Sequence, residues 1–281
     1  SLDVFPQYYG EIPSLESVRF ITYPTIADLV ANRSVWNGAA RIRQNLLEEM
    51  DLENLVTYQY ELPQYTALFL NTDSPFLTKN KERIGLSKAI DKDEILKAID
   101  YRVRIDTPLL ELNQEEWIHS TDLSAAQGAL FDSGWKLAEG DIYRTNEEDE
   151  TYSLRLVRRD FSQDNQAQEE VSRITADLIV QQLKAVGVEL IIEKYAQSEL
   201  QERIKTRDYD MLLYGQSLGY NLDTFAYWHS SQVSETGLNL SNYKNPEVDF
   251  LIENIRGTFD TEEKQILLQD LAETITADVP A

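Results

Sequence analysis

The stretch DYDMLLYGQSLGYNLDTFAYWHSSQVSETGLNLSNYKN, residues 208–245, organises the rest of the sequence. Its apolar run 211–214 is short enough for a buried strand and too short for a helix, and we expect the strand to end at Gly215. The residues that follow are rich in tyrosine, asparagine, glutamine and serine. An apolar body with a few converging polar groups is typical of a small-molecule pocket wall. A long surface loop with incidental aromatic residues fits the same composition, so both interpretations stay open.

Composition excludes several classes of function. The net charge of −23 disfavours binding to nucleic acid and to anionic membranes, because both carry negative charge. The chain has no cysteine, which rules out disulfides, thiol nucleophiles and cysteine-ligated metals, and which suits an oxidising compartment. No apolar run approaches the ~18 residues needed to span a membrane, and we expect no signal peptide within these residues. Because Ser1 is not a methionine, we expect a piece of a longer polypeptide.

Helical and strand patterns alternate along the chain, without a repeat or a low-complexity linker, which predicts an α/β or α+β layered fold. The clearest helix is 166–186, with apolar residues at a spacing of three to four. We expect helix caps at Thr78 or Asn80, and at Asp91, Asp122, Ser198, Asn245 and Asp260. The predicted strands are 17–23, 55–62, 65–71, 151–158, 188–193 and 211–214. The other predicted helices are 26–31, 39–50, 78–90, 92–99, 124–132, 198–205, 246–256 and 261–277.

Motifs in a characteristic order give the chain a family resemblance. The segment LFLNTDSPFLTKNKERIGLSKAIDKDEILKAI, the segment DLSAAQGALFDSGWKL and the segment LSNYKNPEVDFLI resemble the family 5 extracellular solute-binding proteins, the peptide- and nickel-type receptors of ABC importers. The similarity covers nearly all 281 residues. The matching positions include Arg83, Leu86, Ala89, Ile90, Asp91, Gly134, Trp135, Tyr209, Asp210, Gly215, Tyr243, Asn245, Pro246, Val248 and Asp249.

The resemblance implies a fragment of a two-lobed protein with the type II periplasmic-binding-protein fold. Members of the family are roughly twice this length. Residues 1–58 would be the tail of the first lobe, and residues 59–281 would be the second lobe, a twisted mixed sheet flanked by helices. Ligands of such proteins bind in the cleft between the lobes, so this chain would hold half of a site. The resemblance also implies an extracytoplasmic location, ABC permease subunits as partners and a membrane tether outside this sequence.

The candidate ligand-binding residues follow the strand at 211–214. In peptide-binding members, this loop carries a Trp and then an Asp that pairs with the ligand's α-ammonium. Here Gln216 and Gly219 stand at those two positions, and Asp223 is displaced by four residues. A buried ammonium needs a nearby carboxylate, so this departure leaves a longer or blocked peptide, or another ligand, open. The predicted contact residues are Gln216, Ser217, Gly219, Tyr220, Asn221, Asp223, Trp228 and His229.

Metal binding and catalysis are weaker interpretations. His229 could contact a ligand or a metal, but a hydrogen-bonded structural histidine is the more common case, and the chain's other histidine is His119. We expect no metal site and no cofactor. No nucleophile elbow, HExxH, P-loop or dinucleotide fingerprint occurs, so we do not expect an enzyme. The first hypothesis is a receptor that captures oligopeptides for an ABC importer. The alternatives are a sensing module of the same fold and a receptor for a non-peptide ligand such as a metal chelate.

Overall fold

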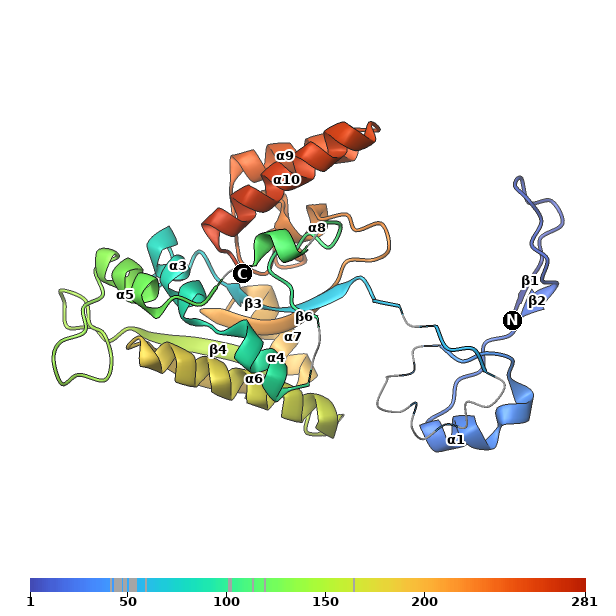
Figure 1. The fold of residues 1–281 in the computed structure, drawn as a ribbon, viewed down its shortest axis with the longest axis horizontal. Coiled ribbons are helices and arrows are strands. Elements are labelled where there is room, and N and C mark those ends of the chain that lie inside the picture. The colour runs from blue at the N-terminus through green and yellow to red at the C-terminus, as the bar shows by residue number, and fades with distance from the viewer. Residues whose placement is uncertain are drawn as a thin grey trace. The chain divides into compact units, whose positions relative to one another are not determined.

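The computed structural model describes residues 1–40, 42, 47, 50, 55–58, 60–100, 103–112, 114–118, 120–163 and 165–281. The chain divides into two compact units, Ser1–Glu61 and Leu62–Ala281. Each unit is described by itself below (Figure 1). Within the described ranges, no helix combines the length and the apolar character that a bilayer crossing requires.

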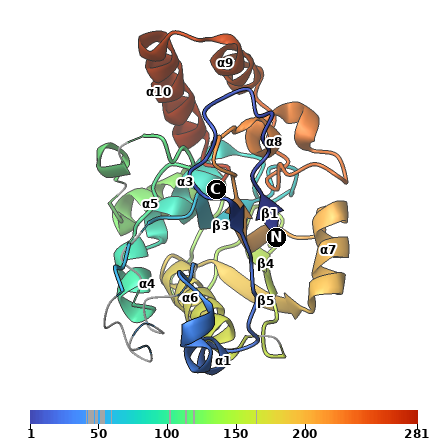
Figure 2. The same ribbon diagram turned by 90° about the vertical axis from the view of Figure 1, so that its right-hand side faces the viewer.

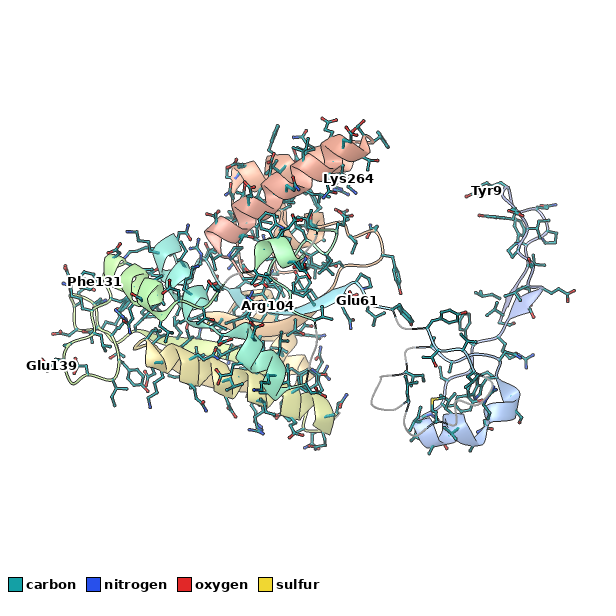
Figure 3. The ribbon with its side chains drawn as sticks, in the orientation of Figure 1. Tyr9, Glu61, Arg104, Phe131, Glu139 and Lys264 are labelled. Carbon is teal, nitrogen blue, oxygen red and sulfur yellow. The ribbon has the colours of Figure 1, made fainter. Side chains whose placement is uncertain are left out.

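The described residues of the first unit form short elements and bury almost no side chains. Strand β1 (Leu2–Asp3) pairs antiparallel with β2 (Ser17–Val18), and α1 (Ile26–Ala31) is capped by the Thr25 hydroxyl. A 3₁₀ turn, η1, covers Arg33–Val35. Of the described side chains in residues 1–61, Trp36 alone is buried, at 9% exposure, whereas Tyr9 is 96% exposed (Figure 3).

Two predictions for this unit need correction, and a third cannot be assessed. The strand predicted at 17–23 is limited to Ser17–Val18, because its partner β1 has only two residues. The strand predicted at 55–62 is absent from the described residues of that range, which pair with no neighbouring strand. Most of the helix predicted at 39–50 lies outside the described residues.

A mixed four-stranded sheet forms the centre of the second unit, as predicted. Its order is β3-β6-β4-β5, with β3 (Gln64–Leu70), β4 (Ser153–Arg159), β5 (Glu189–Tyr195) and β6 (Met211–Ser217). Strands β4, β5 and β6 run parallel, and β3 is antiparallel to β6. Gly215 does not end β6 as expected, because it pairs with Thr66 and the ladder continues to Ser217.

Helices cover both faces of this sheet (Figures 1 and 2), with α6 on one side and α9 and α10 on the other. One core packs α3, α4, α5 and α6 against one face, and a second core packs α7, α8, α9 and α10 against the opposite face. The strand alternation explains this division: Leu156 belongs to the first core and its neighbour Val157 to the second. The helices are α3 (Asn80–Ala89), α4 (Lys92–Ala98), α5 (Leu123–Asp132), α6 (Gln166–Ala185), α7 (Gln197–Thr206), α8 (Phe225–Trp228), α9 (Pro246–Gly257) and α10 (Thr261–Asp278), with 3₁₀ turns at η2 (Gln114–Trp117) and η3 (Ser230–Gln232).

Most of the predicted helix starts are confirmed. The side chains of Asp91, Asp122, Asn245 and Asp260 each accept a backbone N–H from the first turn of the following helix.

Two helix starts differ from the prediction. Helix α3 starts after Lys79, because the Glu82 carboxylate accepts the Lys79 N–H at 2.9 Å, so neither Thr78 nor Asn80 is the cap. Helix α7 follows Ala196, which has no capping side chain, so Ser198 lies inside the helix.

Residues that carry the family resemblance stabilise the sheet at the amino end of β6. The buried carboxylate of Asp210 accepts the Ser74 hydroxyl at 2.7 Å and the Arg155 N–H at 2.8 Å. The buried Arg83 donates to the carbonyl oxygens of Leu77, Thr78 and Asp278. Trp135 stacks on Tyr152 with ring centroids 4.3 Å apart, which confirms its prediction as a core residue. These residues maintain the fold.

Candidate functional site

The parallel strands bring three loops to one edge of the sheet. Strands β4, β5 and β6 end at Arg159, Tyr195 and Ser217, and β3 begins beside them because Gln64 pairs with Ser217. In open α/β sheets, ligands bind at the carboxyl ends of the strands. We call residues 159–163, 195–198 and 217–224 the carboxyl edge. It contains five of the eight residues that the sequence predicts as ligand contacts.

Gln216 faces the interior. It is 7% exposed, its Oε1 accepts the Tyr65 hydroxyl at 2.8 Å, and its Nε2 donates to the Leu238 carbonyl at 2.9 Å. Burial raises the pKa of Tyr65 above its ordinary value, so this hydroxyl stays protonated and remains a donor. Both ends of the Gln216 amide are bonded within the unit, which favours a structural role, and its contact with a ligand stays a prediction.

The loop beyond Gln216 faces solvent on a fixed base. Ser217, Gly219, Tyr220 and Asn221 are exposed, and Tyr220 is 77% exposed. Gly219 has a φ of +73°, a left-handed conformation that favours glycine. The base is fixed because the Leu218 N–H donates to the Pro63 carbonyl at 2.8 Å. The loop therefore exposes neutral polar and aromatic side chains to solvent, while its base is fixed by a backbone hydrogen bond.

Asp223 is bonded inside the unit. Its Oδ1 accepts the Phe225 N–H at 3.1 Å, and its Oδ2 lies 3.4 Å from the Arg256 Nε. The Arg256 guanidinium also lies over the Phe225 ring, 4.5 Å from its centroid. Burial, together with the charge of Asp223, raises the pKa of the neighbouring Tyr227. The Asp223 carboxylate thus holds the start of α8.

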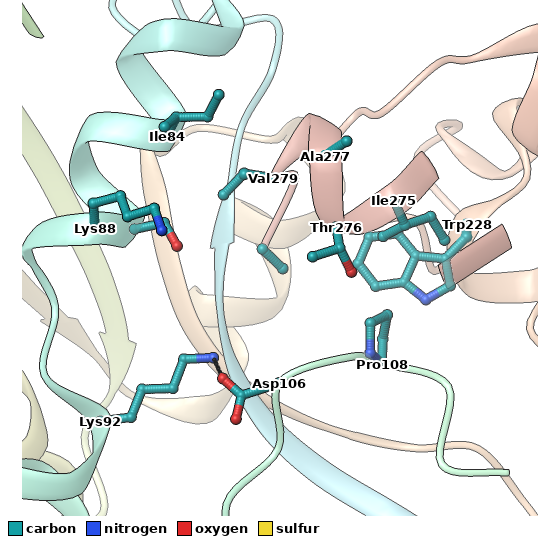
Figure 4. Close-up of a pocket in the computed structure, with 12 residues that line it drawn as sticks. Ile84, Lys88, Lys92, Asp106, Pro108, Trp228, Ile275, Thr276, Ala277 and Val279 are labelled. Atoms are coloured by element: carbon teal, nitrogen blue, oxygen red, sulfur yellow. Dashed lines mark hydrogen bonds and ion pairs between the residues drawn. The ribbon is translucent and has the colours of Figure 1, made fainter. Parts of the chain in front are cut away.

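Trp228 and His229 are buried beyond the loop. Trp228 is 1% exposed and belongs to the core, where it lines a cavity of about 220 Å³ beside α3 and α10 (Figure 4). His229 stacks on Phe225 with centroids 4.3 Å apart, and its Nδ1 lies 2.8 Å from the Ser231 hydroxyl oxygen. This burial favours a structural role for both residues, in agreement with the structural interpretation of His229, and their contact with a ligand stays a prediction. His119 lies outside the described residues.

Pattern reasoning missed a second part of the carboxyl edge. A cavity of about 400 Å³ lies at the ends of β4 and β5, close to the start of α7. Such a volume falls in the range of ~300–1,000 Å³ that is usual for ligand pockets. The only available signal was position, because these residues follow two predicted strands directly. The cavity is lined by Asp160, Gln163, Ala196, Gln197, Ser198 and Gln201.

Charged residues at the end of β4 and the start of α6 are paired, among them Asp160 of the cavity lining. The guanidinium of Arg158 bonds both carboxylate oxygens of Glu169, at 2.8 and 3.0 Å, and these bonds lower the pKa of Glu169. Asp160 accepts the Ser162 N–H at 2.9 Å and lies 3.6 Å from the Lys194 Nζ. Hydrogen bonds from Ser162, with a smaller contribution from Lys194, lower the pKa of Asp160, so its carboxylate is ionised at neutral pH. In the described part of the chain, no three side chains of metal-ligating type gather.

Comparisons with known proteins agree with this architecture. The oligopeptide-binding protein AppA of Bacillus subtilis is 25% identical over 235 residues, which are 77% of this chain and 40% of the relative. Its solved structure, in complex with a nonapeptide, matches 78% of this chain and 44% of its own, with 23% identity and a TM-score of 0.63. NikZ of Campylobacter jejuni, solved with Ni(L-His), matches 84% of this chain and 48% of its own, with 21% identity and a TM-score of 0.68.

The chain thus spans less than half the length of these relatives, and the solved structures establish the periplasmic-binding-protein-like fold. The family model for bacterial extracellular solute-binding proteins, family 5, middle region, matches residues 1–237. That match covers most of the sequence, and the mixed sheet with helices on both faces agrees with it. The chain belongs to the family 5 bacterial extracellular solute-binding proteins.

Proposed function

We propose that this chain is part of the substrate-binding component of an ABC importer that captures oligopeptides. The observation that carries the proposal is the family match over residues 1–237. The B. subtilis relative is an oligopeptide-binding protein, and its structure holds a nonapeptide, which supports a peptide as the ligand. In this proposal, residues 1–58 belong to the tail of a first lobe and residues 59–281 form a second lobe. The protein binds and releases its ligand, and no bond of the ligand is broken.

The carboxyl edge is the proposed ligand surface of the second lobe. Ser217, Gly219, Tyr220 and Asn221 are exposed there on a loop whose base is held by the sheet. The cavity at the ends of β4 and β5 lies along the same edge, since β4 is the neighbour of β6 in the sheet. Exposed aromatic and neutral polar groups on a rigid scaffold suit a peptide, whose backbone needs hydrogen bonds and whose side chains need contact area.

The proposed partners and location follow from the family. Its members are described as extracellular, so we propose an extracytoplasmic protein that delivers its ligand to ABC permease subunits. A tether to the membrane would lie outside the sequence described here. A net charge of −23 keeps such a protein away from anionic lipid headgroups except where it is tethered.

Thermal unfolding of the full-length protein with candidate ligands tests the proposal. A ligand that binds the folded state stabilises it by about 2.7 kcal/mol at 100 times its Kd, which raises the Tm of a protein of this full length by about 2 °C. We expect this rise with a pool of nonapeptides and no loss of intact peptide. A rise with Ni(L-His) alone would indicate a metal-chelate receptor, and no rise with either would contradict a receptor. If peptide binds but deletion of the permease leaves peptide uptake unchanged, the sensing alternative is favoured.

A further inference from the structure

The carboxyl edge carries two carboxylates, and both already have partners in the unit. Asp160 bonds the Ser162 N–H and lies 3.6 Å from the Lys194 ammonium. Asp223 bonds the Phe225 N–H and lies 3.4 Å from Arg256. Every residue of the carboxyl edge is among those the structure describes. Each carboxylate therefore already has a cation beside it, which reduces what it would gain from a ligand ammonium.

The rest of this edge is mainly neutral. Arg159, its one basic residue, lies over the Phe161 ring at 4.5 Å from the centroid. The Oε1 of Gln197 is buried at the cavity and finds no hydrogen-bond donor among the described residues. Such an acceptor is costly to leave unpaired, so a rotation of the half-buried side chain toward the cavity would let it accept an incoming N–H or O–H group. The exposed neutral polar residues of the edge and its cavity are Gln163, Ser198, Gln201, Ser217, Tyr220 and Asn221.

We propose that this edge binds uncharged amide or hydroxyl groups of the ligand, with Gln197 as an acceptor, and provides no counter-charge for the ligand's amino terminus. Desolvating an ammonium beside paired carboxylates costs free energy that a neutral amide avoids. The family position that would supply such a carboxylate holds Gly219, and Asp223 is engaged elsewhere. The edge thus distinguishes ligands by hydrogen bonding instead of charge. This inference rests on the proposed function and specifies the chemistry of its ligand.

Calorimetric titration of the full-length protein with two peptide pools tests the inference. Both pools contain nonapeptides of alanine, glutamine, serine and valine with amidated carboxyl termini, and one pool is also N-acetylated. For each of three proteins, the wild type, Asp160→Asn and Asp223→Asn, the Kd of the free-amine pool is divided by the Kd of the N-acetylated pool. We expect the ratio to stay within about twofold across the three proteins, because neither carboxylate pairs with the ligand. A tenfold change of the ratio in either variant would overturn the inference.

A glutamine substitution tests the assigned acceptor. Gln197→Met keeps the length of the side chain and removes its amide, so we expect weaker binding of both pools by about two- to tenfold. Gln181→Met is the matched control. Gln181 is exposed near the carboxyl end of α6, whereas the carboxyl edge lies near the amino end of that helix, so this variant should leave both Kd values unchanged. Unchanged binding in Gln197→Met would contradict the assignment of Gln197. Absence of binding of either pool to the wild type would contradict the proposed function itself.

Discussion

The two units of the chain contain similar kinds of apolar residues, which are buried in one unit and exposed in the other. In unit 62–281, two cores of buried leucines, isoleucines, valines and aromatic residues fill both faces of one sheet. In unit 1–61, large apolar side chains remain exposed, and the described strands are two residues long. These exposed residues are Leu2, Phe5, Tyr8, Tyr9, Ile12, Leu15, Val18, Phe20, Ile21, Val35, Val56, Tyr58 and Tyr60. Burial against a sheet, and not apolar content, therefore distinguishes the two units.

Paired leucine substitutions test this comparison with the largest expected effect. Leu154 is fully buried in β4, and Leu154→Ala should lower the free energy of unfolding by about 2–5 kcal/mol through lost burial and a cavity. Leu15 in unit 1–61 is 67% exposed, and Leu15→Ala should change it by less than about 0.5 kcal/mol. Urea denaturation measures both. Equal losses would mean that Leu15 is packed in solution, and the contrast between the units would fail.

The Arg158–Glu169 pair gives a smaller effect that depends on pH. Glu169→Gln leaves a buried guanidinium without its counter-charge, which should cost about 1.5–3 kcal/mol at pH 7. The folded-state pKa of Glu169 lies below its ordinary value of 4.5, so its stabilisation is complete above pH 4.5 and is lost as the pH falls further. The difference between wild type and variant should therefore shrink below pH 4.5.

Urea midpoints between pH 7 and pH 3 measure this difference. Glu170→Gln is the matched control, because Glu170 is exposed on the same helix, and it should change stability by less than about 0.5 kcal/mol. A difference between wild type and Glu169→Gln that stays constant over this pH range would show that the charge of Glu169 contributes nothing.

The bond from Tyr65 to Gln216 separates a structural residue from a ligand contact. Tyr65→Phe leaves the buried Oε1 of Gln216 without its donor and should cost about 1–3 kcal/mol. Tyr214→Phe is the matched control, because Tyr214 is half-buried in the same strand as Gln216 and its hydroxyl bonds none of the described residues, and it should cost under about 0.5 kcal/mol. Ligand affinity measured at full folding should stay the same in both variants. A change in affinity without a change in stability would return Gln216 to the ligand surface.

Tyr220 should show the smallest effect on stability and a clear effect on binding. Because the Tyr220 side chain is 77% exposed, Tyr220→Ser should change the free energy of unfolding by less than about 0.5 kcal/mol. The loss of an aromatic contact should weaken peptide binding by about 1–2 kcal/mol, roughly 5- to 30-fold. Phe259→Ser, at a fully exposed position outside the carboxyl edge, should leave the Kd unchanged. Equal Kd values for the two variants would remove Tyr220 from the site.

The sequence predicts most of unit 62–281 because its local signals agree with its packing. The 166–186 helix and the caps Asp91, Asn245 and Asp260 are confirmed because each depends on nearby residues. The end of β6 was misplaced at Gly215, since pairing with β3 depends on a segment about 150 residues away. The strand predicted at 55–62 has suitable residues, but those of them that the structure describes pair with no strand.

The candidate site was only partly predictable for the same reason. The exposed residues after Ser217 stand out in composition, but composition does not show which side chains point inward. The alternation of faces along β6 shows the direction of each side chain. Leu212 and Leu218 belong to one core, and Gln216 lies an even number of residues from both, so it faces the same core. Gln197 and Asp160 were missed because their approach to each other depends on the pairing of β4 with β5. That pairing follows from tertiary packing and leaves no mark on local periodicity.

Hydrogen–deuterium exchange of the full-length protein, with and without the neutral nonapeptide pool, tests the central claim most directly. The claim is that the carboxyl edge of the sheet holds the ligand. We predict slower exchange in backbone segments covering 217–224 and 195–201 when the peptide is bound, because ligand contact protects loops that otherwise open locally. Protection confined to α9 and α10, or to the cavity beside Trp228, with none at the carboxyl edge, would contradict the account.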